Sequence, residues 1–434
     1  MNKIHIVGGG LAGCEAAWQI SKRGIPVVLY EMRPVRTTAA HLTDSLGELV
    51  CSNSLRSDKE TTAVGTLKRE LRLLDSIILR CAEETRIPAG GALGVDRKRF
   101  AEAVTSFISN QPNIEVVREE ITKLPDGETI IASGPLTSPT LTKELFELFG
   151  TDHLNFYDGI SPIVDAETLT PGSFFEADRY DSQEENGDYL NVVMSQSEYK
   201  MLIHDLVSAD VKPHLEEEKE PNFFDGCLPI EEMARRGVDT PRFGPLKPVG
   251  LIDPKTGMEP YAVLQLRKED LTGKLYNLVG FQTQLSIPDQ KAVLKKIPAF
   301  ENAVFVRYGS AHRNTYIESP KLLNPDLTCV NRSNIRIAGQ LAGVEGYVES
   351  TACGLMAGLF VSVPGIEPPP ATTVIGGLIK YITQTETKDF QPMKANWGVV
   401  SELEKRIRKK RIKKEKLADR SSTAIKEYVQ TFLQ

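Results

Sequence analysis

Cysteine is scarce in this chain, and apolar runs long enough to cross a membrane are absent. The 434 residues include 6 cysteines, without C-x-x-C pairs or dense spacing, so we expect neither a disulfide framework nor a zinc site nor any other metal site. No apolar run reaches the roughly 18 residues of a membrane span, and no basic leader precedes the first strand. We therefore expect a cytoplasmic protein that is neither secreted nor membrane-spanning.

Positive charge is not in excess, although it is locally concentrated. A net charge of -6 argues against a uniformly basic nucleic-acid binder. Residues 405–416 nevertheless read KRIRKKRIKKEK, a block that either binds several phosphates or forms a solvated helix face. The candidate RNA contacts within it are Lys409, Lys410, Arg411 and Lys413.

The N-terminal segment IHIVGGGLAGCEAA is the most informative part of the sequence. An apolar strand at residues 4–7 leads into Gly8, Gly10 and Gly13, which have G-x-G-x-x-G spacing, and a helical stretch continues to Ile20. Gly8 would permit the turn, Gly10 would let the backbone approach a pyrophosphate, and Gly13 would let the helix pack on the strand. The pattern predicts a dinucleotide site; the alternative is a tight turn without a ligand.

A second strand, residues 27–30, completes this pattern because it ends in an acidic residue. Glu31 lies about 20 residues past the glycines, where a carboxylate can accept hydrogen bonds from both ribose hydroxyls.

A second glycine-rich segment, IRIAGQLAGVEGYVESTACG, favours a flavin over a nicotinamide as the bound cofactor. We expect a strand at residues 335–338, a loop that contains Gly339, Gly343 and Gly346, and a helix at residues 349–360. A helix N-terminus aimed at the pyrimidine end of an isoalloxazine ring would stabilise the negative charge that develops there on reduction. The alternative is a second packing unit of the same sheet.

The remaining patterns indicate a doubly wound α/β protein of the Rossmann type with an inserted domain. Residues 113–121 and 129–132 read as strands, and one helix with a single buried face is expected from the spacing of Leu67, Leu71, Leu74, Ile78 and Cys81. We expect a cofactor-binding domain in two parts, residues 1–200 and 326–434, the second ending in a basic helical region. An α+β domain would be inserted at residues 201–325.

Nine strings spread over nearly the whole chain resemble one family, the bacterial folate- and flavin-dependent tRNA (uracil-5-)-methyltransferases. They are GGGLAGCEAAWQ, EMRP, LVCSNSLRSD, GALGVDR, PNFFDGCLPIEEMARRG, YAVLQLRKED, LYNLVGFQT, AGVEGYVESTACGLMAG and PMKANWG. The resemblance implies a flavoprotein fold of the glutathione-reductase-like class. It also implies methylation of a T-loop uridine of tRNA to 5-methyluridine, with carbon from 5,10-methylenetetrahydrofolate and hydride from reduced FAD that NADH or NADPH regenerates. No obligatory protein partner is inferred.

Two other functions remain open. Relatives could perform the same chemistry on ribosomal RNA. A non-methylating flavoprotein, like the one that modifies wobble uridines with a partner GTPase, is a further alternative, but the strings CSNSLRSD and DGCLP argue against it.

Cysteine chemistry follows from the reaction, because uracil C5 becomes nucleophilic only after a soft nucleophile such as a thiolate adds to C6. Cys227 lies in DGCLPIEEMARRG, where Pro229 is a plausible first helical residue, so the thiol would sit just before a helix N-terminus. The charges of Glu231 and Glu232 would oppose ionisation of the thiol unless they face away. The alternative for Cys227 is a small buried hydrophobe.

A second thiol, Cys51 in LVCSNSLRSD, is expected beside the cofactor domain. The resemblance implies that Cys227 adds to uracil C6 and that Cys51 transfers protons or protects the site near flavin and base; exchanged roles remain open. Cys14, Cys329 and Cys353 are interpreted as packing residues.

Folate is expected to lie against the isoalloxazine ring. Tyr347 and His312 are candidates for stacking on or bonding to the pterin, with Arg313 or Lys247 for its anionic parts. Ordinary packing of Tyr347 and His312 is an equally compatible reading.

Overall fold

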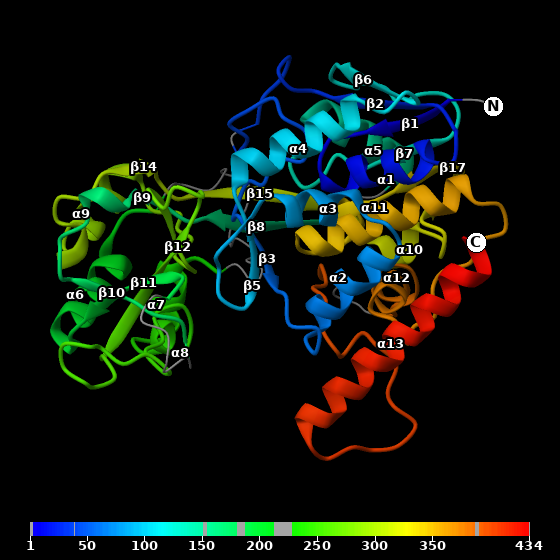
Figure 1. The fold of residues 1–434 in the computed structure, drawn as a ribbon. Helices are drawn as coiled ribbons and strands as arrows, with labels where there is room; N and C mark the ends of the chain where they lie inside the picture. The colour runs from blue at the N-terminus through cyan, green and yellow to red at the C-terminus, as the bar shows by residue number, and fades with distance from the viewer. Residues whose placement is uncertain are drawn as a thin grey trace.

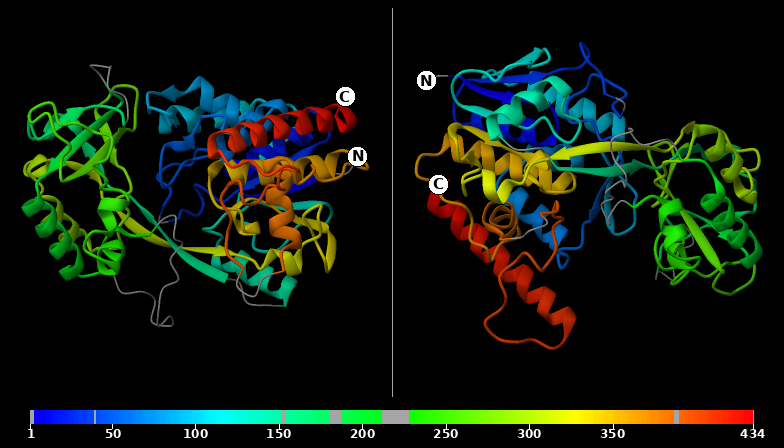
Figure 2. Two further views of the ribbon diagram at one scale, coloured as in Figure 1. Left: turned by 90° about the horizontal axis from the view of Figure 1, so that it is seen from below. Right: turned by 180° about the vertical axis from the view of Figure 1, so that it is seen from behind.

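The chain folds into a large and a small body, each with its own hydrophobic core, joined by two long strands (Figures 1 and 2). The computed structural model describes residues 3–38, 40–150, 154–179, 187–211, 228–386 and 390–433. The first and the last described residues both lie on the large body (Figure 1).

A parallel sheet forms the centre of the large body and confirms the predicted α/β class. Its strand order is β16-β17-β7-β1-β2-β6, and all neighbouring strands pair in parallel except β16 with β17. The strands are β1 (Ile4–Val7), β2 (Val27–Glu31), β6 (Ile114–Arg118), β7 (Thr129–Ile131), β16 (Thr328–Cys329) and β17 (Arg332–Ile337). The β1 strand therefore pairs on one side with β2 and on the other with β7, which brings the two glycine-rich segments to the same end of the sheet.

Helices and a small antiparallel sheet surround this centre. They are α1 (Leu11–Ser21), α2 (Ala63–Leu73), α3 (Ile77–Glu84), α4 (Arg97–Ser109), α5 (Pro139–Phe149), α10 (Ser319–Leu322), η4 (Gly339–Ala342), α11 (Tyr347–Ser362), α12 (Val374–Gln384) and α13 (Lys410–Phe432), with β3 (Ser54–Ser57), β4 (Arg86–Ile87) and β5 (Ala92–Val95). Helices α1 and α11 approach closely because small residues line their contact. A Cβ atom on Gly354 would lie 2.2 Å from the Ala12 carbonyl oxygen.

The small body is an antiparallel sheet with helices, in strand order β10-β11-β12-β13-β9-β14. Its strands are β9 (Ile163–Asp165), β10 (Phe174–Glu176), β11 (Tyr189–Met194), β12 (Ala262–Lys268), β13 (Leu275–Leu278) and β14 (Phe305–Arg307). Its helices are η1 (Ala166–Thr168), α6 (Gln196–Ser208), α7 (Ile230–Arg236), α8 (Thr240–Phe243), α9 (Ile287–Leu294) and η3 (Pro298–Phe300). The connecting strands β8 (Leu154–Ile160) and β15 (Ser310–Tyr316) pair antiparallel.

The second core begins earlier in the sequence than expected. Its buried residues run from Val164 to Phe300. Residues 164–179 and 187–200, which we assigned to the first part of the cofactor domain, therefore lie in the small body. The β9, β10 and β11 strands form this sheet together with β12 and β13, and local sequence patterns do not reveal such long-range pairing.

Two local expectations also differ from the structure. The single helix expected between Leu67 and Cys81 is two helices, because Asp75 adopts a left-handed conformation (φ 59°) and the Ser76 side chain caps α3. Pro229 is the N-cap of α7 rather than its first residue. Burial of Cys14, Cys81, Cys329 and Cys353 confirms that these four cysteines are packing residues.

Within the described ranges, no helix is both long and apolar enough to cross a bilayer. The same ranges contain no cluster of three or more His, Cys, Asp or Glu side chains that could hold a metal ion.

Candidate cofactor cleft and active site

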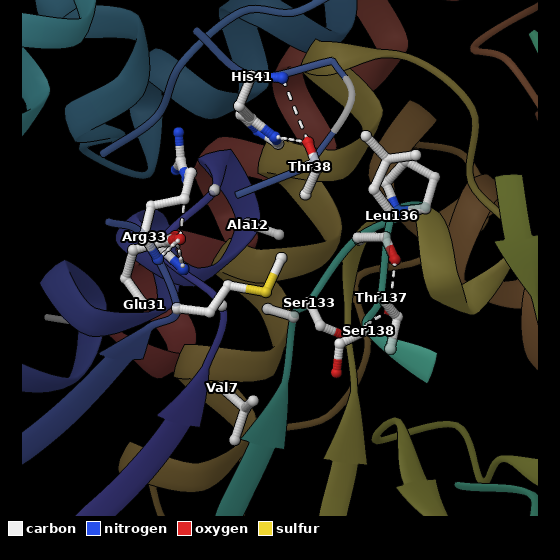
Figure 3. Close-up of a pocket in the computed structure, with 18 of the residues that line it drawn as sticks. Val7, Ala12, Glu31, Arg33, Thr38, His41, Ser133, Leu136, Thr137 and Ser138 are labelled. Carbon is white, nitrogen blue, oxygen red and sulfur yellow. Dashed lines mark hydrogen bonds and ion pairs between the residues drawn. The ribbon is translucent and has the colours of Figure 1, made fainter. Parts of the chain in front are cut away.

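A cleft opens at the carboxyl ends of β1, β2 and β7, where parallel sheets bind nucleotides. Its empty volume is about 1050 Å³, and both glycine-rich segments line it. Figure 3 shows Glu31, Arg33 and His41 on one side of this cleft and the segment Ser133 to Ser138 on another. Five predicted cofactor residues line it together: Gly8, Gly10, Glu31, Gly339 and Tyr347.

The three glycines of the first segment differ in what surrounds them. Gly8 has φ 111°, and a Cβ there would lie 2.4 Å from the Ala132 carbonyl oxygen; at Gly13 a Cβ would lie 1.9 Å from the Gly8 oxygen. A Cβ on Gly10 would meet no atom within 4 Å, because Gly10 faces the open cleft at the N-terminus of α1. Gly8 and Gly13 are therefore required by the fold itself, whereas Gly10 leaves space for a ligand.

Glu31 is held in place inside the cleft. Its Oε2 accepts a hydrogen bond from the Gly9 amide (3.0 Å), and its Oε1 accepts one from Arg33 Nε (2.8 Å). Arg33 is 2% exposed and also pairs with Glu48. Burial alone would raise the pKa of Glu31, but Arg33 and the Gly9 amide hold the pKa below its usual value. The carboxylate therefore remains an acceptor.

The second glycine-rich segment places the N-terminus of α11 at the cleft. Gly346 is the N-cap of α11, with φ 114°. Gly343, a predicted cofactor contact, lines neither cavity, and a Cβ there would lie 2.5 Å from the Phe390 ring. Its carbonyl oxygen accepts a hydrogen bond from the Met393 amide, which fixes the PMKANWG segment beside α11.

A second cavity, with an empty volume of about 990 Å³, adjoins the first and contains Cys51. The two cavities share Val50, Pro135, Leu136, Gln340 and Tyr347. The two cavities are therefore direct neighbours, and Cys51 lines the cavity beside the cofactor cleft. Cationic side chains also line this second cavity: Arg56, Arg267 and Lys394.

Tyr347 holds the Cys51 loop from the cofactor side. The backbone amides of Cys51 and Ser52 both donate to the Tyr347 hydroxyl oxygen, at 2.9 and 3.2 Å, and the Cys51 sulfur lies 3.0 Å from the same oxygen. Burial, followed by interaction with Cys51, raises the pKa of Tyr347 well above its ordinary value, so the hydroxyl keeps its proton.

Three buried or half-buried arginines hold the same loop from other sides. Arg97 donates to the carbonyl oxygens of Leu49 (2.6 Å) and Val50, and Arg307 also donates to Val50. Arg267 reaches across from the small body and donates to the side chains of Asn53 and Ser52. Sequence reasoning missed these residues, although Arg97 and Arg267 stand in the strings GALGVDR and YAVLQLRKED.

The other predicted site residues are not all in these cavities. Lys247 lines neither of them; its carbonyl oxygen accepts a hydrogen bond from Arg179 in the small body. His312 and Arg313 lie on β15, two residues and one residue before Asn314, which lines the second cavity. Cys227 lies outside the described residues.

The cationic block forms an exposed arm at the start of α13, which we call the cationic arm (residues 409–416). Its Lys and Arg side chains are exposed, whereas Leu417, Ala418 and Ile425 are buried against the large body. Figure 1 shows this end of α13 projecting beyond the body. Cations at a helix N-terminus oppose the helix dipole, so this clustering lowers helix stability and requires another explanation.

Comparisons with known proteins agree with this geometry. The family described as glucose inhibited division protein A matches residues 3–364. Curated proteins of Bacillus cereus (strain Q1) and Bacillus anthracis (strain CDC 684 / NRRL 3495), each named methylenetetrahydrofolate--tRNA-(uracil-5-)-methyltransferase TrmFO, are 52% identical over 430 residues, 98% of each chain. The form I crystal structure of Aquifex aeolicus GidA is similar in fold, with a TM-score of 0.70 and 17% identity over 98% of this chain and 76% of that chain.

Proposed function

We infer the reaction of this chain from the family to which it belongs, the methylenetetrahydrofolate--tRNA-(uracil-5-)-methyltransferases within the glucose inhibited division protein A family. The protein is an FAD-dependent enzyme that methylates C5 of uridine in tRNA with the one-carbon unit of 5,10-methylenetetrahydrofolate. One structural observation supports this conclusion at the level of the site: the cofactor cleft shares part of its wall, including Tyr347, with the cavity that Cys51 lines.

The described residues fit FAD at the cleft. We propose that the free space at Gly10 and the N-terminus of α1 receive the pyrophosphate and that the Glu31 carboxylate accepts the ribose hydroxyls. Gly339, Gly346 and the N-terminus of α11 would lie against the pyrimidine end of the ring. Bound there, the reduced flavin supplies the hydride that turns a transferred methylene into a methyl group.

The thiols would act on the uracil ring. In this proposal Cys227 adds to uracil C6, which makes C5 nucleophilic, and Cys51 takes part in proton transfer at the same base. We expected the charge of Glu231 to oppose ionisation of Cys227 unless it faced away. The Glu231 side chain is buried, with the residue 1% exposed, and its Oε1 accepts a hydrogen bond from the Gln284 backbone amide (2.7 Å). Burial raises the pKa of Glu231 above its usual value.

The folate and the nicotinamide would share the extended cavity with the base. Tyr347 lines both cavities and remains our candidate for the pterin, and His312 and Arg313 lie on the strand that passes the second cavity. The position of Lys247 in the small body gives it less support as a folate contact. We propose that NADH or NADPH reduces the flavin.

The cationic arm is our candidate for contact with the tRNA, in which a T-loop uridine would be the target. About eight residues of exposed helix extend roughly 12 Å, enough to reach several phosphates. Phosphates would relieve the unfavourable placement of cations at this helix N-terminus. A protein acting on tRNA in this way would work in the cytoplasm.

A methylation assay tests the function. Purified yellow protein is incubated with 5,10-methylenetetrahydrofolate, NADPH and either unmodified tRNA or, in a parallel reaction, unmodified ribosomal RNA, and nucleosides are identified by mass spectrometry. We expect 5-methyluridine with the wild type and none with Cys227→Ala. Product on ribosomal RNA alone would select the first alternative, and a flavin-containing protein that methylates neither RNA would select the second.

A further inference from the structure

We propose that Tyr347 is a positioning residue for Cys51. The Tyr347 hydroxyl donates a hydrogen bond to the Cys51 sulfur and thereby stabilises the thiolate. The proposal rests on the proposed function only for the use that is made of this thiolate. The hydrogen bond itself follows from the arrangement of three groups around the Tyr347 hydroxyl oxygen: the Cys51 amide, the Ser52 amide and the Cys51 sulfur.

The direction of the Tyr347–Cys51 hydrogen bond follows from the two amides. A phenol oxygen has two lone pairs and one proton. The Cys51 and Ser52 amides can only donate, and both point at this oxygen, at 2.9 and 3.2 Å. Both lone pairs are then engaged, so the remaining contact, 3.0 Å to the sulfur, uses the hydroxyl proton. The sulfur is the acceptor, and an ionised sulfur is a much better acceptor than a neutral thiol.

The charges around the Cys51 loop favour the same ionised form. Among the side chains that the structure describes, the charged groups that face the loop, line its cavity or pair with a group that does are Arg56, Arg97, Arg267, Arg307, Lys394, Glu269, Glu345 and Glu349. Arg97 and Glu269 neutralise each other in a bidentate pair, and Arg56 pairs with the buried Glu349. The other described groups are three cations, Arg267, Arg307 and Lys394, and one carboxylate, Glu345. The guanidinium groups of Arg97 and Arg267 interact electrostatically with Cys51. The local potential is therefore positive where the thiolate would form.

Tyr347 also determines where the sulfur can be. It stands at the first position of α11, a long buried helix, and reaches a loop that lies 296 residues earlier in the sequence. One hydroxyl thus fixes both the backbone and the sulfur of Cys51 relative to the cofactor cleft. Arg97, Arg267 and Arg307 still hold the loop when only this hydroxyl is removed, so the thiol should stay in the cavity but lose its anion-stabilising donor.

The test is the pH dependence of Cys51 alkylation in the FAD-loaded enzyme. Iodoacetamide reacts with thiolates, so the rate at which the Cys51 peptide gains mass reports the ionised fraction without any RNA or folate. We expect the wild-type rate to reach half its maximum below the pH of about 8.5 that is typical of free cysteine. In Tyr347→Phe we expect the rate at pH 7 to fall about tenfold and the midpoint to move to higher pH.

A matched control removes a tyrosine hydroxyl elsewhere in the large body. Tyr381 is also half-buried, and its hydroxyl donates to the Gln391 carbonyl oxygen (2.8 Å), so Tyr381→Phe should leave the Cys51 profile unchanged. An unchanged profile in Tyr347→Phe would overturn the proposal. The wild-type measurement stands even if Tyr347→Phe does not fold, since a midpoint at or above that of free cysteine would also overturn it.

The pH profile of Cys51 alkylation distinguishes a failure of the Tyr347–Cys51 hydrogen bond from a failure of the methyltransferase function. A low midpoint that depends on Tyr347, in a protein that makes no 5-methyluridine, would retain the hydrogen bond and reject the methyltransferase activity. A Cys51 thiol that ionises like free cysteine, in a protein that makes 5-methyluridine, would reject the hydrogen bond and retain the methyltransferase activity.

Discussion

Arg97 of the large body and Glu269 of the small body form a bidentate ion pair beside the Cys51 loop. Arg97 Nε and Nη2 each donate to one carboxylate oxygen at 3.0 Å, and the Glu269 side chain is 4% exposed. The same guanidinium holds the Leu49 carbonyl oxygen through Nη1. The position of the small body and the position of the active-site loop are therefore fixed by the same side chain.

Removal of the Glu269 carboxylate should weaken both the fold and the site. Glu269→Ala leaves the Arg97 guanidinium, whose side chain is 16% exposed, without its partner, and breaking a largely buried pair costs about 3 kcal/mol. We expect this loss in the free energy of unfolding, measured by urea denaturation, together with reduced methylation. The control is Glu102→Ala, which breaks the exposed Lys98–Glu102 pair on the same helix α4 and should cost less than about 1 kcal/mol. Equal losses in both variants would contradict this account.

Two glycine substitutions should separate cofactor binding from folding. Gly10→Ala adds a Cβ that meets no protein atom within 4 Å but projects into the cleft, so we expect a folded protein that retains little FAD. Gly13→Ala places a Cβ 1.9 Å from a backbone oxygen and should prevent correct folding. Circular dichroism and the ratio of flavin absorbance to protein check both outcomes. A Gly10→Ala protein with full flavin content would contradict the placement of the pyrophosphate.

Acid should destabilise the protein partly through His41, which lines the cofactor cleft. Burial, followed by the positive charge of Arg33, lowers the pKa of His41 to about 4. In the unfolded chain His41 binds a proton near pH 6.5, whereas in the folded chain it stays neutral down to a pH of about 4. The stability that His41 contributes is therefore complete above pH 6.5 and is lost as the pH falls towards 4. Between pH 7 and pH 5 the loss should be about 2 kcal/mol larger in the wild type than in His41→Asn, measured as the free energy of unfolding. Parallel pH profiles of the two proteins would contradict the assignment.

Neutralising the cationic arm should weaken RNA binding in a salt-dependent way. Changing Lys409, Lys410, Arg411 and Lys413 to glutamine removes four exposed charges. We expect weaker tRNA affinity at low salt and a smaller slope of log affinity against log salt, by up to about 3. Filter binding at several salt concentrations measures both quantities.

The control for the cationic arm removes the same number of exposed charges elsewhere on the large body. It consists of glutamine substitutions at Lys98, Lys123, Lys143 and Lys380. An equal change of slope in this variant would show a general charge effect and no role for the arm.

The sequence predicts the N-terminal nucleotide unit well because local rules determine it. Residues 4–7 form β1 as expected, since an apolar run and a glycine turn leave little choice of structure. Ser76, the N-cap residue at which a second helix starts, is itself a helix start signal in the sequence.

The rest of the site depends on contacts between distant residues, which periodicity cannot reveal. Tyr347 meets Cys51 across 296 positions, and Arg267 meets Asn53 across 214. The sequence indicates Tyr347 and Cys51 as separate candidates. Only the fold shows that the Tyr347 hydroxyl contacts the Cys51 sulfur. The partners of Arg97 and Arg267 are defined only once the small body is docked on the large one.

The most direct test of the methyltransferase function follows the carbon atom itself. Wild-type enzyme is supplied with unmodified tRNA, NADPH and 5,10-methylenetetrahydrofolate whose methylene carbon carries an isotope label, and the digested nucleosides are weighed by mass spectrometry. We predict 5-methyluridine that carries the label, formed only by flavin-containing protein. Unlabelled 5-methyluridine, or unmodified uridine from a fully flavin-loaded enzyme, would contradict this account.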